Sequence, residues 1–130
     1  MDRRPSAQFK SSVLVLAAFV ALGSSAVAAA LPGGLTSAAD GLRSATGLPL
    51  YTYDNDTMVG MSHCFADCAK DWPPLIAPAK AKASGDWSLV MREDGSRQWT
   101  FKLKPLYTCA RDLPGKPAAC ADVPGFRRAK

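Results

Sequence analysis

The sequence predicts a small, mainly β domain built from two related β units and a central hairpin, with one short helical turn and stabilising disulfides. Three observations lead to this prediction: a repeated tetrapeptide, a stretch of strand-like alternation around a turn, and four cysteines in a short chain. A chain of 130 residues suits one domain, small enough for covalent cross-links to matter.

The first 28 residues have the composition of a secretory signal peptide. Three basic residues precede the uncharged run 13–22, small residues follow, and cleavage is expected near Ala28. The apolar run is too short to cross a bilayer, so we expect no membrane span. The sequence therefore predicts a protein that is secreted or periplasmic.

The charge of the chain gives little support for a nucleic-acid partner. The formal net charge is +5, and it falls to +3 without residues 1–28, which hold three basic side chains and one acidic side chain. The remaining basic residues are scattered, apart from a short basic tail at 127–130. We expect no binding to nucleic acids.

Composition also suggests where the domain begins and ends. Residues 29–41 are rich in Gly, Ala and Ser without an apolar period, which predicts a flexible leader. The β domain is expected over residues 42–126. Three prolines and two glycines follow Asp112, so irregular backbone without strands is expected there.

An internal repeat supplies the two related β units. The tetrapeptide Pro-Leu-Tyr-Thr occurs twice, with its tyrosines at Tyr51 and Tyr107, and an aspartate follows each copy, Asp56 and Asp112. Strand alternation places Tyr51 and Tyr53 on one face, and the second copy has a cysteine where the first has Tyr53.

The stretch from Trp87 to Lys104 predicts the central hairpin, with β-favouring runs on both sides of Asp94 and Gly95. Pairing Glu93 with Arg97 best separates an apolar face of the hairpin from a polar one. This register gives a three-residue loop or a bulge at Gly95. That register sets Met91, Leu89 and Trp87 opposite Trp99, Phe101 and Leu103, and turns Arg92, Gln98, Ser88 and Lys102 to water. The core is expected to contain Trp87, Trp99, Leu89, Phe101, Tyr51 and Tyr107.

A short helix or helical turn is expected at residues 63–71, which lack β-branched side chains and end before Trp72 and two prolines. Cys64 and Cys68 are spaced i, i+4, so a helical turn would bring their side chains together at disulfide range. Four cysteines allow three pairings. A local bridge here would leave Cys109 and Cys120 for a second one.

The same segment admits a different interpretation. Met58, Met61, His63, Cys64 and Cys68 form a soft-ligand cluster that suits monovalent copper, and His63 with two thiolates suits zinc. A reactive thiol pair activated by His63 is a further alternative. Both alternatives need reduced sulfurs, whereas a binding domain with disulfides needs no cofactor.

Catalytic patterns are few. His63 is the only histidine, and its candidate nucleophiles Ser62 and Cys64 are its immediate neighbours, an arrangement that rarely lets side chains meet productively. We therefore expect no hydrolytic enzyme.

The ordered segments "GLPLYTYDND", "CFADCAKDWPPL", "GDWSLVMREDGSRQW" and "KPLYTCARD" resemble a bacterial family of lipoprotein-like secreted proteins with a Tyr-x-aromatic-x-x-Asp motif, the secreted repeat of unknown function. The resemblance spans roughly residues 42–112. Its motif positions fall on Tyr51, Tyr53, Asp56, Tyr107 and Asp112, with Cys64, Cys68 and Trp72 in the family's Cys-x-x-x-Cys and Trp-Pro-Pro.

The resemblance has three implications. Cys109 and Cys120 are additions to the family pattern, which supports pairing them with each other. There is no cysteine near the cleavage site, so no lipid anchor is expected. The family has no known reaction and favours a non-enzymatic binding or structural role with an envelope or extracellular partner, whose expected contact surface includes Tyr53, Asp54 and Asp56.

Overall fold

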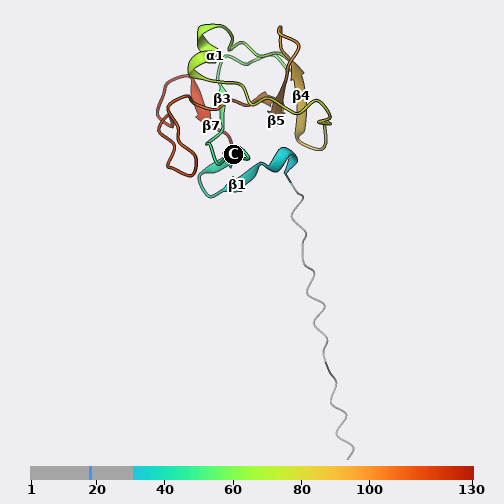
Figure 1. Cartoon of the computed structure of the whole chain (residues 1–130), viewed down its shortest axis with the longest axis vertical. Coiled ribbons are helices and arrows are strands. Elements are labelled where there is room, and N and C mark those ends of the chain that lie inside the picture. The colour runs from blue at the N-terminus through green and yellow to red at the C-terminus, as the bar shows by residue number, and fades with distance from the viewer. Residues whose placement is uncertain (1–17, 19–30) are drawn as a thin grey trace, which may run out of the picture.

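The computed structural model describes residue 18 and residues 31–130 (Figure 1). The signal peptide expected over residues 1–28 lies outside these residues, except for residue 18. The elements in chain order are η1 (Pro32–Gly34), β1 (Thr36–Ala38), β2 (Gly41–Arg43), β3 (Tyr51–Tyr53), α1 (Asp67–Asp71), β4 (Trp87–Met91), β5 (Arg97–Phe101), β6 (Lys104–Pro105) and β7 (Phe126–Arg128).

The fold is mainly β, as the sequence predicts. β1 pairs with β2, β3 pairs with β7, and β4, β5 and β6 form a three-stranded sheet; every pairing is antiparallel. The β4–β5 hairpin lies on one side of the domain and β7 lies on the other (Figure 1). The chain thus forms several small sheets around a shared core.

The register of the central hairpin differs from the expected one by two residues. Leu89 lies opposite Trp99, and Met91 lies opposite Arg97. The loop has three residues, as expected, but Arg92 and Ser96 close it, with the Arg92 N–H donating to the Ser96 carbonyl at 2.8 Å. Gly95, in the left-handed region at φ 83°, completes the turn.

The burial of the hairpin also differs from the expectation. Gln98, expected to face water, is fully buried, and its side-chain amide donates to the Leu106 carbonyl at 2.7 Å. Val90 is also buried, whereas Met91, expected on the core-facing side of the hairpin, is 68% exposed. Both faces of the hairpin are therefore covered at one end, and a polar side chain is accepted in the core because it is hydrogen-bonded.

The folded part begins earlier than expected. η1 and β1 occupy residues assigned to the flexible leader 29–41, and Leu35 is buried in the core. Leu35 supplies the apolar contact that anchors this short, Gly-rich segment. The leader prediction is wrong for residues 32–41, because one buried side chain outweighs the local composition.

The end of the chain is also part of the fold. β7 contains Phe126, Arg127 and Arg128, and Ala129 is buried, so residues 127–130 are not a free tail. The Ala129 N–H donates to the Leu50 carbonyl at 2.9 Å. The expectation that no strand follows Asp112 is therefore wrong at β7, although the backbone between them is irregular.

The core consists of two clusters. The first contains Leu35, Leu42, Leu50, Ala77, Trp87, Trp99, Leu106 and Ala129, with Leu89 and Phe101 packed partly buried against it. The second contains Tyr51, Cys64, Trp72, Tyr107, Cys109, Cys120 and Phe126. All six side chains expected in the core lie in or against these clusters.

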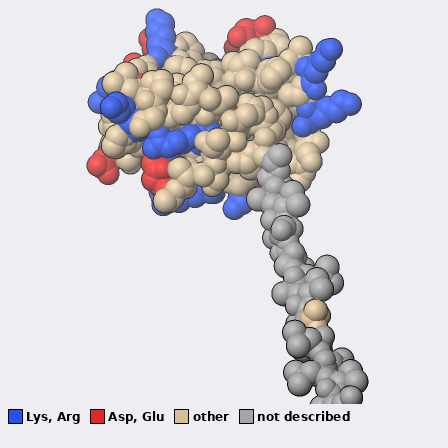
Figure 2. Space-filling view, turned by 60° about the horizontal axis from the view of Figure 1, so that its bottom comes forward, with Lys and Arg blue, Asp and Glu red and all other residues tan. Residues whose placement is uncertain are grey.

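The helical turn is shorter than expected, since α1 spans only Asp67–Asp71 of the predicted segment 63–71. None of the helices among the described residues has both the length and the apolar composition needed to span a bilayer. On the face shown in Figure 2, basic side chains project at several separate places.

The two repeated units cross each other. The Tyr51 and Tyr107 backbones exchange hydrogen bonds of 2.8 and 2.9 Å, each N–H donating to the other carbonyl. Tyr51 in the first unit pairs with Arg128 at the end of the second, and Tyr107 in the second bridges to Pro74 at the end of the first. Each tyrosine strand therefore takes its neighbour from the other unit.

The first core cluster repeats this relation. The Ala129 N–H donates to the Leu50 carbonyl, and the Leu75 N–H donates in the same way to Leu106. At the centre, Trp72 from the end of one unit stacks on Phe126 from the end of the other, with ring centroids 3.7 Å apart. The units are thus related by an approximate two-fold arrangement.

Candidate functional site

The repeated tyrosines and aspartates form crossed pairs. The Tyr51 hydroxyl donates to Oδ2 of Asp112 at 2.6 Å, and the Tyr107 hydroxyl donates to Oδ2 of Asp56 at 2.6 Å. Each tyrosine therefore binds the aspartate of the other unit. All four side chains are buried.

The second carboxylate oxygen of each aspartate closes a loop within its own unit. Oδ1 of Asp56 accepts the His63 backbone N–H, and Oδ1 of Asp112 accepts the Ala119 backbone N–H, both at 2.6 Å. Residues 57–63 and 113–119 are thus equivalent loops of seven residues. We call them the first loop and the second loop.

Burial also controls the ionisation of the two tyrosines. Removal from water, followed by the hydrogen bond to the Asp112 carboxylate, raises the pKa of Tyr51 well above its usual value. Burial and the Asp56 carboxylate raise the pKa of Tyr107 in the same way. Both hydroxyls keep their protons and act as donors at neutral pH.

Most residues of the motif are internal, including Asp56, which was expected at the contact surface. Tyr51, Asp56, Trp72, Tyr107 and Asp112 are buried, so they make structural contacts and present no surface to a partner. Tyr53 is half-buried and stacks on Phe126 at a centroid distance of 4.5 Å. Asp54 lies at the surface, where its carboxylate accepts the Arg127 Nε–H at 2.8 Å. The motif therefore describes how the units are joined.

The cysteines form two bridges, Cys64–Cys68 and Cys109–Cys120, the pairing that the resemblance implied. No cysteine in the described part of the chain is free. Cys109, Asp112 and Cys120 converge in the core, but the two sulfurs are bonded to each other. The thiolate ligands that the copper and redox alternatives assigned to Cys64 and Cys68 are therefore not present in this state.

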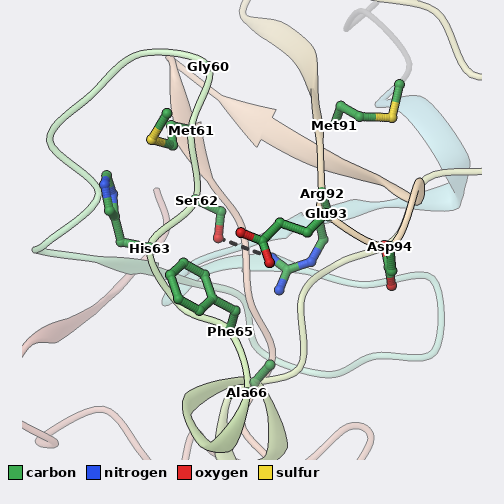
Figure 3. A pocket seen from close by; sticks show the side chains of 11 residues that line it. Gly60, Met61, Ser62, His63, Phe65, Ala66, Met91, Arg92, Glu93 and Asp94 are labelled. Carbon is green, nitrogen blue, oxygen red and sulfur yellow. Dashed lines mark hydrogen bonds between the residues drawn. The ribbon is translucent and has the colours of Figure 1, made fainter.

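A pocket of about 540 Å³ opens between the first loop and the tip of the β4–β5 hairpin (Figure 3). Its wall is apolar where the loop runs into α1 and polar at the hairpin tip. The lining residues are Gly60, Met61, Ser62, His63, Phe65, Ala66, Ala69, Met91, Arg92, Glu93 and Asp94.

Arg92 fixes the loop against the hairpin. Its guanidinium donates to the Ser62 hydroxyl at 3.0 Å, to Oε1 of Gln98 at 2.8 Å and to the Cys64 carbonyl at 2.9 Å. The Ser62 hydroxyl lies 2.6 Å from the Tyr107 hydroxyl, which itself donates to Asp56. A continuous hydrogen-bond chain thus links the pocket wall to the crossed pairs.

His63 lies on the loop side of the pocket, next to Met61 in Figure 3. Its Nδ1 is buried without a hydrogen bond and faces Oδ1 of Asp56 at 3.6 Å. The Ser62 hydroxyl contacts Tyr107 and Arg92, and the His63 imidazole makes no hydrogen bond to either of them. The side chains therefore do not form a serine–histidine nucleophile pair.

Sequence reasoning identified only part of this pocket. The sequence predicts Met61 and His63 as candidate site residues, but not Phe65, Arg92 or Glu93. Alternation turns Arg92 to water and Met91 toward the core, whereas both line the pocket. The sequence pattern does not predict that the hairpin tip lies against the first loop, because the two segments are about thirty residues apart along the chain.

Comparison with known protein families finds a match in the first half of the domain. Residues 34–76 match the family model described as a secreted repeat of unknown function. This confirms the family resemblance over that segment. The match covers β1, β2, β3, the first loop and α1, and it includes Tyr51 and Asp56.

Searches of curated proteins and of solved structures find no match. The family of the secreted repeat is described as secreted, and the two disulfides are consistent with an oxidising location outside the cytoplasm. The family description assigns no function to the repeat.

Proposed function

We propose that this chain is a non-enzymatic binding domain exported to the periplasm or cell envelope, and that the pocket at the first loop is its binding surface. The signal-like composition of residues 1–28, the disulfides and the secreted family support export. The partner is a peptide segment of an exported protein that carries apolar and basic side chains.

One observation carries the proposal: exposed apolar side chains concentrate around this pocket. Eight large hydrophobic residues of the described chain are exposed, and five of them are on the first loop or line the pocket. These five are Met58, Val59, Met61, Phe65 and Met91. An exposed apolar group of this kind marks interaction sites more often than chance packing does.

The second loop provides an internal comparison. It is closed by the same aspartate contact, yet it packs down on the domain, where the Gly115 N–H donates to the Gly47 carbonyl and Arg43 donates to the Lys116 carbonyl. Among its side chains only Leu113 is a large exposed hydrophobe. The apolar surface is therefore a property of the first loop and not of the scaffold.

The charges at the pocket favour a basic partner. The Arg92 guanidinium is already used by three acceptors, whereas Glu93 and Asp94 stand at the hairpin tip and form no ion pair within residues 31–130. Hydrogen bonds from the Ser96 hydroxyl and N–H hold the pKa of Asp94 below its usual range. Two carboxylates beside apolar side chains complement lysine or arginine next to leucine-like residues.

The test uses the purified, disulfide-intact protein and two labelled peptides, one alternating leucine with lysine and one alternating leucine with glutamate. We expect the lysine peptide to bind at least about tenfold more tightly, since like charges at an interface are strongly unfavourable. Glu93→Gln with Asp94→Asn should remove this preference, and Phe65→Ala should weaken binding.

Leu113→Ala is the matched control on the second loop and should leave binding unchanged. Equal affinity for the two peptides, or the same loss with Leu113→Ala as with Phe65→Ala, would contradict the proposal. NMR chemical-shift changes upon peptide addition should fall on the first loop and hairpin tip, and changes confined to residues 113–119 would place binding elsewhere.

A further inference from the structure

Soft ligand atoms gather on the first loop. The chain has four methionines and one histidine, and Met58, Met61 and His63 all lie within this seven-residue loop. Met58 is 56% exposed and Met61 is 46% exposed, so neither thioether is needed to fill the core. Both thioethers are therefore accessible to a ligand from solvent.

The backbone of the loop keeps these three residues close together. The Met61 N–H donates to the Met58 carbonyl at 3.3 Å, which makes residues 58–61 a turn. The ends of such a turn lie within about 7 Å of each other. His63 follows two residues later, fixed by its backbone bond to Asp56, and Figure 3 shows its ring beside Met61 and away from Met91.

The orientation of His63 leaves one ring nitrogen available. Nδ1 is buried, has no hydrogen bond and faces the Asp56 carboxylate at 3.6 Å. A histidine that binds a metal through Nε2 commonly directs Nδ1–H to a carboxylate, which fixes the tautomer. The buried Asp56 carboxylate stands in that position behind His63.

The donor set favours a soft monovalent cation. Thioether sulfur and imidazole nitrogen suit Cu(I), whereas Mg²⁺ and Ca²⁺ require several oxygen ligands. Thioethers do not form disulfides, so they remain available as ligands in a compartment where Cys64 and Cys68 are bonded.

From this geometry we propose that the first loop is a Cu(I) site, with Met58 Sδ, Met61 Sδ and His63 Nε2 as ligands and Asp56 as the residue that positions the imidazole. This site differs from the cysteine-containing cluster expected from the sequence, because both cysteines are excluded. It uses different chemistry from peptide binding at the same pocket and does not depend on it.

The test is an anaerobic competition between the disulfide-intact protein and bicinchoninate, a chromophoric Cu(I) chelator. We expect the protein to remove one equivalent of Cu(I) from the chelator. Met58→Leu, Met61→Leu and His63→Gln should each weaken the affinity at least about tenfold. Met91→Leu, a methionine on the opposite wall of the pocket, is the matched control and should leave the affinity unchanged.

Three results would overturn the proposal. The protein could fail to remove Cu(I) from the chelator, the three ligand variants could bind Cu(I) as tightly as the unmodified protein, or Met91→Leu could lose as much affinity as the ligand variants. Intact mass after alkylation of the copper-loaded protein should show no modified cysteine; alkylation of Cys64 or Cys68 would assign the copper to thiolates instead. X-ray absorption should show sulfur and nitrogen neighbours, and a spectrum with oxygen neighbours alone would exclude this ligand set.

The copper and peptide experiments separate the two proposals. Leucine in place of Met58 or Met61 retains an apolar side chain but removes the thioether ligand. These variants should therefore lose copper affinity and keep the preference for the lysine peptide. A protein that binds copper but neither peptide would remove the proposed function alone.

Discussion

Asp56 and Asp112 show how a single carboxylate serves two purposes. One oxygen accepts a tyrosine hydroxyl from the other unit, and the second accepts the N–H that closes a loop in its own unit. A buried carboxylate is costly unless its oxygens are hydrogen-bonded. In this chain both aspartates meet this double requirement, and the spacing from tyrosine to aspartate is the same in the two units.

At the residue scale we predict that Tyr51→Phe and Tyr107→Phe each lower the free energy of unfolding by about 1–3 kcal/mol, because each leaves a buried carboxylate without one of its donors. Urea denaturation followed by tryptophan fluorescence would measure both. Tyr53→Phe is the control, since that hydroxyl only accepts a bond from Asn55 at the surface, and its effect should stay within about 0.5 kcal/mol. A loss in Tyr53→Phe as large as in the other two would contradict this explanation.

The same tyrosines predict instability in alkali. Burial raises the pKa of Tyr51 and Tyr107, so the folded protein retains their protons at a pH where the unfolded chain releases them. Their contribution is constant below about pH 10, and above it the free energy of unfolding should fall by up to about 1.4 kcal/mol per pH unit for each tyrosine. Urea midpoints between pH 8 and 11.5 would show this decline, and a double Tyr→Phe variant with the same slope would refute it.

At the scale of elements, the hairpin illustrates what the sequence alone predicts and what it does not. Trp87, Leu89 and Trp99 share one face, as alternation predicts, because their large apolar side chains permit only one orientation. The pairing itself is shifted by two residues, a change that alternation cannot detect. Gln98 donates to the Leu106 carbonyl and accepts from Arg92, and the alternation pattern predicts neither hydrogen bond.

The β1–β2 hairpin gives a second prediction. Gly41 has φ 133°, and a Cβ atom there would lie 2.5 Å from the Ala129 carbonyl oxygen, which accepts the Leu42 N–H at 2.8 Å. Gly41→Ala should therefore destabilise the domain by about 3 kcal/mol, combining backbone strain with the clash. Gly95→Ala has the strain without a neighbour within 4 Å and should cost about 1–2 kcal/mol. Equal losses by urea denaturation would mean that the approach of Ala129 is unimportant.

The disulfides give a third prediction at this scale. Cys109–Cys120 closes a longer loop than Cys64–Cys68, with sequence separations of 11 and 4. Chain-entropy arguments assign about 3 kcal/mol to the longer loop and about 2 kcal/mol to the shorter one. Paired Cys→Ala variants should follow this order in urea denaturation, and the reverse order would show that loop entropy is not the main effect.

At the scale of the whole molecule, the sequence predicts the two units but not their crossing. The repeat at Tyr51 and Tyr107 is visible in the sequence. The pairing of Tyr51 with Asp112 is not, because Asp56 lies much nearer to Tyr51 along the chain. The pocket is not evident from the sequence for a similar reason. Its two walls are the first loop and the tip of the β4–β5 hairpin, so neither segment predicts it alone.

The exchange of contacts between the two units also predicts that the domain unfolds cooperatively. The core clusters, the Tyr–Asp pairs and the stack of Trp72 on Phe126 all combine the two units, so neither unit has a complete core of its own. We expect one transition, with calorimetric and van't Hoff enthalpies that agree. Hydrogen exchange should give similar protection for Tyr51 and Tyr107. Two separate transitions would show that the units fold independently.

The exchange of partners between the two units has a consequence for ancestry. A chain with one such unit would have a tyrosine without an aspartate in reach and a strand without a neighbour. Two copies of that chain would satisfy each other in a symmetric homodimer. The present domain has the arrangement that duplication and fusion of such a dimer would produce, and in a fused chain the two equivalent loops are free to differ, as the first and second loops do.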